Sequence, residues 1–135
     1  MSYGVAAALQ AAIYQRLMAD TALDALIGSA IYDAVPPGTP VGTYVSIGPE
    51  TARDASDQVG RGAFHEFTVS VITDAAGFQN AKAVAAAVSD ALTGAALILA
   101  RGRLVGLWFQ RARARRVEDA DIRRIDLSFR ARVED

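Results

Sequence analysis

The sequence predicts an α+β fold in which helices pack on one face of an antiparallel sheet of about four strands. The periodic segments follow the order helix, helix, strand, strand, helix, strand, strand. A short acidic connection separates the last two strand segments, so they are expected to pair as an antiparallel hairpin. With 135 residues, of which 52% are hydrophobic and 21% charged, the chain suits one packed core, and we expect a single domain over residues 1–135.

Two helices are predicted near the amino terminus. Over residues 2–19 the apolar side chains recur at steps of three and four, which places them on one helical face, and Ser2 is a candidate cap. A shorter helix follows, with Thr21 as its candidate cap. Gly28 is expected to end it, since glycine adopts the left-handed conformation at little cost.

A pair of strands is expected next, after a proline-rich loop at residues 35–40. Residues 43–48 have the β-branched and aromatic content of a short strand, which Pro49 should stop. Residues 64–73 alternate between apolar and polar side chains, as in a strand with one buried face.

A third helix and two further strands complete the predicted fold. The helix has Asp74 as its candidate cap and Gly94 at its end, and its many alanines leave it thin enough to lie close against a sheet. The two strands span residues 104 to about 117 and residues 123–133.

The connection at residues 50–62 contains Val59 as its only large apolar residue. Packing on its own domain would not recover the entropy of about 1–2 kcal/mol per ordered residue, so the segment is predicted to be a long exposed loop, mobile in the free protein. We expect it to become ordered against another molecule through its charged side chains, which are Arg53, Asp54, Asp57 and Arg61.

Residue types suited to catalysis or metal binding are scarce. The chain has no cysteine and a single histidine, His65, which excludes thiolate chemistry and a multi-histidine metal site within one chain. Glycine-rich phosphate loops and nucleophile-elbow motifs are absent. The acidic run at residues 118–121 has oxygen ligands for a divalent cation, but such a run is more often a solvated hairpin tip. We expect no enzyme activity, no metal and no cofactor.

Charge and hydropathy limit the classes of partner. The formal net charge is −1, so no overall positive charge drives non-specific attachment to DNA or to anionic lipid. No apolar run is long enough to span a bilayer, and no membrane partner is expected. A near-neutral surface instead favours association with the same chain or with another protein.

The fourth predicted strand ends in a concentration of arginines, at Arg111, Arg113, Arg115 and Arg116. Strict alternation would place the first three on the same face as Val105, Leu107 and Phe109. They are either a solvated stripe paired with nearby acids or a contact for an acidic partner surface, a neighbouring subunit or passing DNA, since guanidinium groups bind carboxylate and phosphate at two points. Without a strongly basic domain, sequence-specific DNA recognition is not expected.

Several stretches carry, in this order, a resemblance to a known family: residues 8–14, 19–28, 31–36 and 44–48, Gly62 and His65, residues 81–92 and residues 129–131. Together they resemble the tail terminator, or tail completion, proteins of siphophage-like tails, prophages and gene transfer agents. The resemblance implies a structural virion protein that forms a ring, usually hexameric. Such a ring caps the head-proximal end of the tail tube, ends tail polymerisation and joins the tail to the head connector.

The same resemblance implies the partners and the location. The partners would be further copies of the chain, the major tail tube protein and a head completion or stopper protein, with DNA passing through the ring without sequence-specific binding. The location would be the bacterial cytoplasm during assembly and then the tail or neck of the virion. The candidate inter-subunit or tail and neck contacts are the charged residues of the two segments above: Arg53, Asp54, Asp57, Arg61, Arg111, Arg113, Arg115 and Arg116.

Three alternatives stay open from sequence. The chain would be a head completion or stopper protein of the neck, a small nucleic-acid- or ligand-binding module that uses the arginine stripe, or a hydrolase that uses Asp119 and Asp121.

Overall fold

The structure is a computed structural model that describes residues 3–34, 38, 40–55, 61–117 and 121–135. Its elements are α1 (Ala6–Met18), α2 (Thr21–Ile27), β1 (Ile31–Tyr32), β2 (Thr43–Asp54), β3 (Gly62–Thr73), α3 (Gln79–Leu92), β4 (Arg103–Val117) and β5 (Ile122–Glu134). The strands form one sheet in the order β1-β2-β3-β5-β4, in which β1 and β2 are parallel and the other pairs antiparallel. The predicted α+β class is confirmed, and the two-residue strand β1 is an addition to it.

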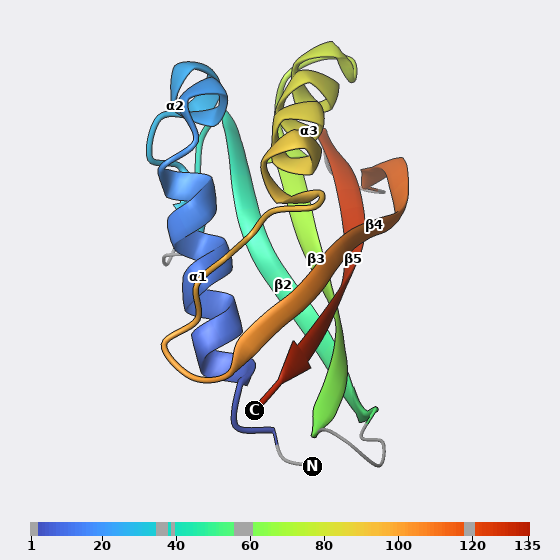
Figure 1. The fold of residues 1–135 in the computed structure, drawn as a ribbon. Coiled ribbons are helices and arrows are strands. Elements are labelled where there is room, and N and C mark those ends of the chain that lie inside the picture. Colours follow the sequence, from blue (N-terminus) through green and yellow to red (C-terminus); the bar gives the residue numbers. More distant parts are fainter. Residues whose placement is uncertain (1–2, 35–37, 39, 56–60, 118–120) are drawn as a thin grey trace.

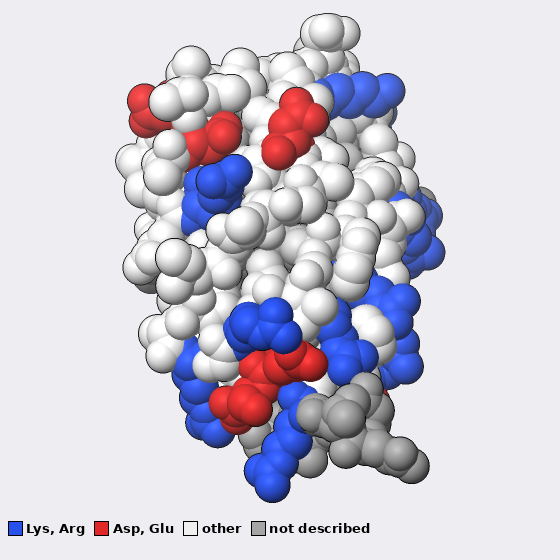
Figure 2. Space-filling view, in the orientation of Figure 1, with Lys and Arg blue, Asp and Glu red and all other residues white. Residues whose placement is uncertain are grey.

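The helices lie on one side of the sheet, with α3 in front of β3 in the view of Figure 1. Figure 2 shows acidic and basic side chains dispersed over this side of the molecule. The core fills the space between the two layers. Helix α1 buries Leu9, Ile13 and Leu17 completely, which confirms its predicted apolar face. From the sheet, Phe129 is also fully buried, and its ring stacks on that of Phe67 at 5.6 Å between centroids.

The caps of the helices differ from the predictions, and only for α3 does a tertiary contact take the predicted capping side chain. Ser2, the candidate cap of the first helix, lies outside the described residues. The cap of α2 is Asp20, whose carboxylate accepts a hydrogen bond from the Leu23 amide at 3.0 Å, one residue before the predicted Thr21. Asp74 was predicted to cap α3, but its carboxylate accepts from the Gly42 amide at 3.1 Å, and α3 begins without a side-chain cap. Gly28 ends α2 with a positive φ of 59°, as predicted.

Strand β2 is longer than predicted because a bulge absorbs the proline that was expected to stop it. Ile47 pairs with Val69 and Glu50 pairs with Phe67, so the two residues between them on β2 face one residue on β3. Pro49 occupies the bulge, where a missing amide hydrogen costs no ladder bond. The strand then continues beside β3 to Asp54.

The predicted loop at residues 50–62 is therefore wrong for residues 50–54, which are part of β2, and for Gly62, the first residue of β3. Pairing with β3 stabilises residues 50–54 in an ordered conformation, although they have too few apolar side chains to be held by packing. Arg53 lies opposite Phe64 and places its guanidinium carbon 5.0 Å from the centre of that ring. Asp57 lies outside the described residues.

The predicted carboxyl-terminal hairpin is confirmed. Strand β5 is sandwiched between β3 and β4 and pairs with both along nearly its whole length. Its alternate residues, such as Ile125, Leu127 and Phe129, are buried under the helices. Strand β4 is left at the edge of the sheet with 15 residues, most of them exposed.

Candidate functional site

The side of the sheet opposite the helices, called here the open face, carries no helix among the described elements (Figure 1). Residues that pair directly across an antiparallel sheet lie on the same face. The pairs Thr68 with Ser128 and Asp126 with Arg113 therefore project from the open face, because the residues flanking them in β5 are buried on the helical side. This face is the candidate functional site.

A bulge in β4 determines from which face of the sheet the arginines of this strand project. Phe109 pairs with Phe129, and Arg111 pairs with Ser128, so Gln110 is an extra residue on β4. Phe109 packs its ring on Phe129 at 5.9 Å on the helical side, and the extra residue turns Arg111 to the open face. The predicted sharing of one face by Phe109 and Arg111 is wrong, since strict alternation fails at a bulge.

The turned arginines line one wall of a hollow of ≈ 400 Å³, called here the basic hollow. Its lining residues are Pro49, Thr68, Arg111, Arg113, Arg115, Arg124, Asp126 and Ser128. The structure thus brings together three of the predicted contact residues with residues of β2, β3 and β5 that are distant in sequence. Four arginines face a single carboxylate in this hollow.

That carboxylate, Asp126, holds two of the arginines in place. It accepts from the Arg124 Nε at 2.8 Å and from the Ser70 hydroxyl at 2.6 Å, and it lies 3.7 Å from the Arg115 Nε. Burial alone would raise the pKa of Asp126, but these hydrogen bonds and the two cations lower it below its ordinary value of 3.8. The carboxylate is therefore ionised at neutral pH and already engaged.

The other half of the open face is aromatic, and we call it the aromatic patch. Phe64, Trp108, Gln110 and Arg130 line a smaller hollow of ≈ 300 Å³. The guanidinium of Arg130 stacks 3.8 Å above the Phe64 ring, and that of Arg132 lies 5.2 Å from it. Trp108 is 48% exposed, a large apolar surface left open to solvent.

The remaining predicted contact residues do not join the basic hollow. Arg53 lies on the open face beside Phe64, at the aromatic patch. Asp54, the next residue in β2, projects from the opposite face. Arg61 is exposed just before β3.

Arg116, the last predicted contact residue, lies on the helical side of the sheet. It pairs across the hairpin with Arg123, whose guanidinium donates to the Ala75 carbonyl near α3.

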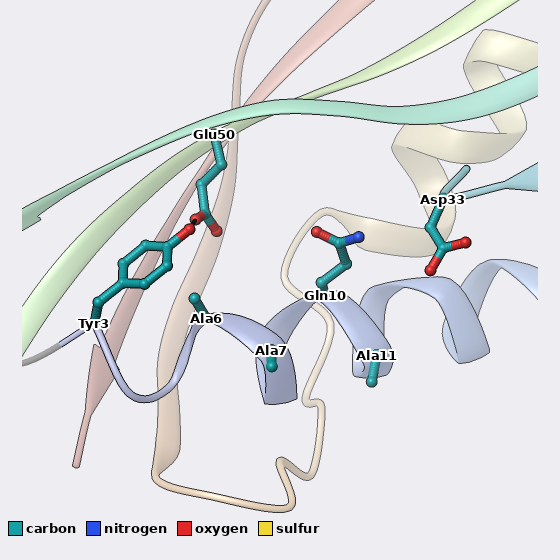
Figure 3. A pocket seen from close by; sticks show the side chains of 7 residues that line it. All are labelled: Tyr3, Ala6, Ala7, Gln10, Ala11, Asp33 and Glu50. Carbon is teal, nitrogen blue, oxygen red and sulfur yellow. Dashed lines mark hydrogen bonds between the residues drawn. The ribbon is translucent and has the colours of Figure 1, made fainter. Parts of the chain in front are cut away.

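A polar cluster of Tyr3, Glu50 and His65 on the helical side was not predicted from the sequence; Figure 3 shows its Tyr3 and Glu50. His65 is fully buried, its Nδ1 lies 3.1 Å from the Glu50 Oε2, and the Tyr3 hydroxyl donates to the other oxygen of Glu50. That hydrogen bond raises the pKa of Tyr3. The Tyr3 ring also stacks over His65 at 6.0 Å, so the cluster fastens the start of the chain to the sheet. Sequence offered no signal for it, because the three residues lie far apart along the chain.

The part of the chain that the structure describes has no group of three or more acidic, histidine or cysteine side chains placed to hold a metal ion. Glu118 and Asp119 of the predicted acidic tip lie outside the described residues, and Asp121 lies within 4.0 Å of the guanidinium groups of Arg116 and Arg123. None of the described helices has the length and apolar content of a membrane span.

Fold and surface together define a small α+β protein whose exposed features are an uncovered sheet face and a long edge strand, both suited to contacts with other molecules. The chain belongs to the family described as Tail completion protein gp17, which matches residues 11–134. It is also similar to a chain of the virion of a native gene transfer agent particle, with 72% sequence identity and a TM-score of 0.93. That match covers 99% of this chain and 100% of the other. No curated protein matches the chain.

These findings confirm the family resemblance seen in the sequence. As a member of this family, the protein has a structural role in tail completion.

Proposed function

We propose that the protein forms a ring, usually hexameric, that caps the head-proximal end of the tail tube, ends its polymerisation and joins the tail to the head connector. The observation that carries the proposal is the 72% identity, over nearly the whole of both chains, to a chain of a gene transfer agent virion. Membership of the tail completion family supports the same role.

The two edges of the sheet support a ring rather than a symmetric dimer. One edge is the 15-residue strand β4, and the other is the two-residue strand β1, which pairs only with Val45 and Ser46 of β2. In the described part of the chain, residues 47–54 of β2 have β3 as their sole strand partner. Two unlike edges suit a head-to-tail contact between copies, and such a contact closes into a ring while it covers both edges.

The aromatic patch is the surface proposed to contact protein partners. Interface centres are enriched in tryptophan, phenylalanine and arginine, and the patch supplies all three through Trp108, Phe64 and Arg130. Arg53 and Arg61 lie at the same end of β2 and β3 and would add polar contacts at its rim, while Asp54, on the helical side of the sheet, would contact a neighbour from that side. The proposed protein partners are further copies of the chain, the major tail tube protein and a head completion or stopper protein.

No catalytic step is part of the proposal. The protein acts by position, in the cytoplasm during assembly and then in the tail or neck of the particle. DNA passes through the ring and is not recognised by sequence.

Particles made without this protein test the proposal. Electron microscopy should show tail tubes of uncontrolled length that are not joined to heads, and adding the purified protein should restore tail length. Native mass spectrometry of the protein with tail tubes should show a closed ring. Tails of normal length that merely fail to join heads would contradict the capping role and assign the protein to head completion or to the stopper.

A further inference from the structure

We propose that the basic hollow binds the phosphodiester backbone of DNA, without regard to base sequence. The inference concerns a binding site beyond ring formation, and it rests on the proposed function only for the presence of DNA at the ring. Its basis is the charge, the donor groups and the shape of the hollow.

Positive charge in the hollow exceeds what the protein itself neutralises. Asp126 is the one acid among the lining residues, and it is engaged by Arg124 and Arg115. Arg111 and Arg113 form no ion pair with any described acid. In a protein with a formal net charge of −1, this local excess marks a site suited to an anion from outside.

The donors of the hollow match phosphate oxygens. Arg111, Arg113 and Arg115 alternate along one strand, so their Cα atoms lie in a row about 6.6 Å apart and their side chains project from the same face. The hydroxyl groups of Thr68 and Ser128 lie in the same hollow. Arginine, serine and threonine side chains are typical phosphate contacts, and a row of cations suits a polymer with regularly repeated charge.

An acidic protein surface fits this hollow less well than DNA does. Protein interfaces draw most of their binding energy from buried aromatic and apolar anchors. The lining includes no large apolar side chain, and Pro49 is its one apolar residue. The aromatic anchors of the open face, Trp108 and Phe64, lie in the separate aromatic patch. The same lack of aromatic rings argues against base stacking, which leaves the backbone as the part of DNA that is bound.

Binding of a labelled duplex of mixed sequence, followed by fluorescence anisotropy at several salt concentrations, tests the proposal. The wild-type ring should bind with a strong inverse dependence on salt. The double variant Arg111→Gln/Arg113→Gln should bind about tenfold more weakly, and the slope of log K against log salt should fall in magnitude by about 2, one per lost contact. Arg111→Lys/Arg113→Lys keeps the charges and should keep most of the slope.

A matched control removes the same charge elsewhere. Lys82, on α3, lies beside Phe78, and Arg101 forms an exposed ion pair with Asp135, so Lys82→Gln/Arg101→Gln leaves the hollow intact. Equal losses of affinity in the two glutamine variants would overturn the proposal, as would the absence of salt-dependent DNA binding by the wild-type ring. Unchanged DNA binding with lost attachment to tails would assign the hollow to a protein partner instead.

Tail length separates this inference from the proposed function. The Arg111→Gln/Arg113→Gln variant should still cap tails at normal length, because the hollow is distinct from the aromatic patch. Circular dichroism should show a thermal midpoint close to that of the wild type, since both side chains are exposed.

Discussion

The two halves of the open face are built on the same strands, β3, β5 and β4, yet they carry different chemistry. The aromatic patch has cations close to the Phe64 ring, whose face attracts them electrostatically. The basic hollow has cations that stand among hydroxyl groups with one carboxylate between them. The extra residue Gln110 lies at the boundary. One bulge in β4 thus allows a single strand to carry both the aromatic patch and the basic hollow. The local charge of the hollow differs greatly from the net charge of the whole chain.

Truncation of Phe129, whose buried ring supports both halves of the open face, should have the largest effect on stability. Phe129 is fully buried below the boundary and contacts the rings of Phe67 and Phe109. Phe129→Ala should lower the free energy of unfolding by about 3–5 kcal/mol, because it leaves a cavity in the core. Urea denaturation followed by circular dichroism measures the change. A loss below about 1 kcal/mol would show that this ring does not support the sheet.

Truncating Trp108 in the aromatic patch should weaken assembly while leaving the stability of the fold nearly unchanged. Trp108→Ala should weaken ring or tail binding by about 2 kcal/mol, as expected for an interface anchor, while leaving the thermal midpoint nearly unchanged because the side chain is half exposed. Sedimentation and tail-capping assays provide the measurement. Ile98 is 96% exposed in the segment between α3 and β4, which runs on the helical side in Figure 1, so Ile98→Ala is the control and should assemble normally. Normal assembly of the tryptophan variant would remove the patch from the interface.

Neutralising Asp126, the single acid that lines the basic hollow, should increase the difference in charge between the hollow and the aromatic patch. Asp126→Asn removes an ionised acceptor for Ser70 and Arg124 and should cost about 1 kcal/mol of stability at neutral pH. Since folding lowers the pKa of Asp126, its contribution is present above the ordinary value of 3.8 and is lost as the pH falls through the folded value.

Unfolding of the wild type and of the asparagine variant should therefore differ at pH 7 and converge once the pH falls below the lowered pKa of Asp126 in the folded protein. DNA binding should become a few-fold tighter in the variant, because a negative charge is gone from the hollow. A constant difference in stability at every pH would show that the carboxylate charge does not matter.

Deleting the boundary residue should have the smallest effect. Without Gln110, Phe109 and Arg111 become consecutive in a regular strand and still point to opposite faces. The deletion should change stability by about 1 kcal/mol or less and should retain DNA binding. Deletion of Ala112 is the control. It removes a paired residue of β4, moves every later side chain of the strand to the other face, and should be poorly tolerated.

Local patterns in the sequence determined much of this protein. The apolar face of α1, the alternation in β3 and β5, and the left-handed Gly28 each depend on residues within a few positions of one another, so they were predictable without the fold. The sequence stretches that resemble tail completion proteins determined the family in the same way.

Which residues meet on the surfaces of the sheet depended on the tertiary structure alone. Strand pairing made residues 50–54 part of β2 although their own apolar content is low, and it placed the bulges at Pro49 and Gln110. A bulge depends on the register with a partner strand, which the period of a single strand does not contain. The faces of Arg111, Arg113 and Arg115, their meeting with Asp126 and the link of Tyr3 to Glu50 therefore required the folded sheet, because each contact joins residues distant in the chain.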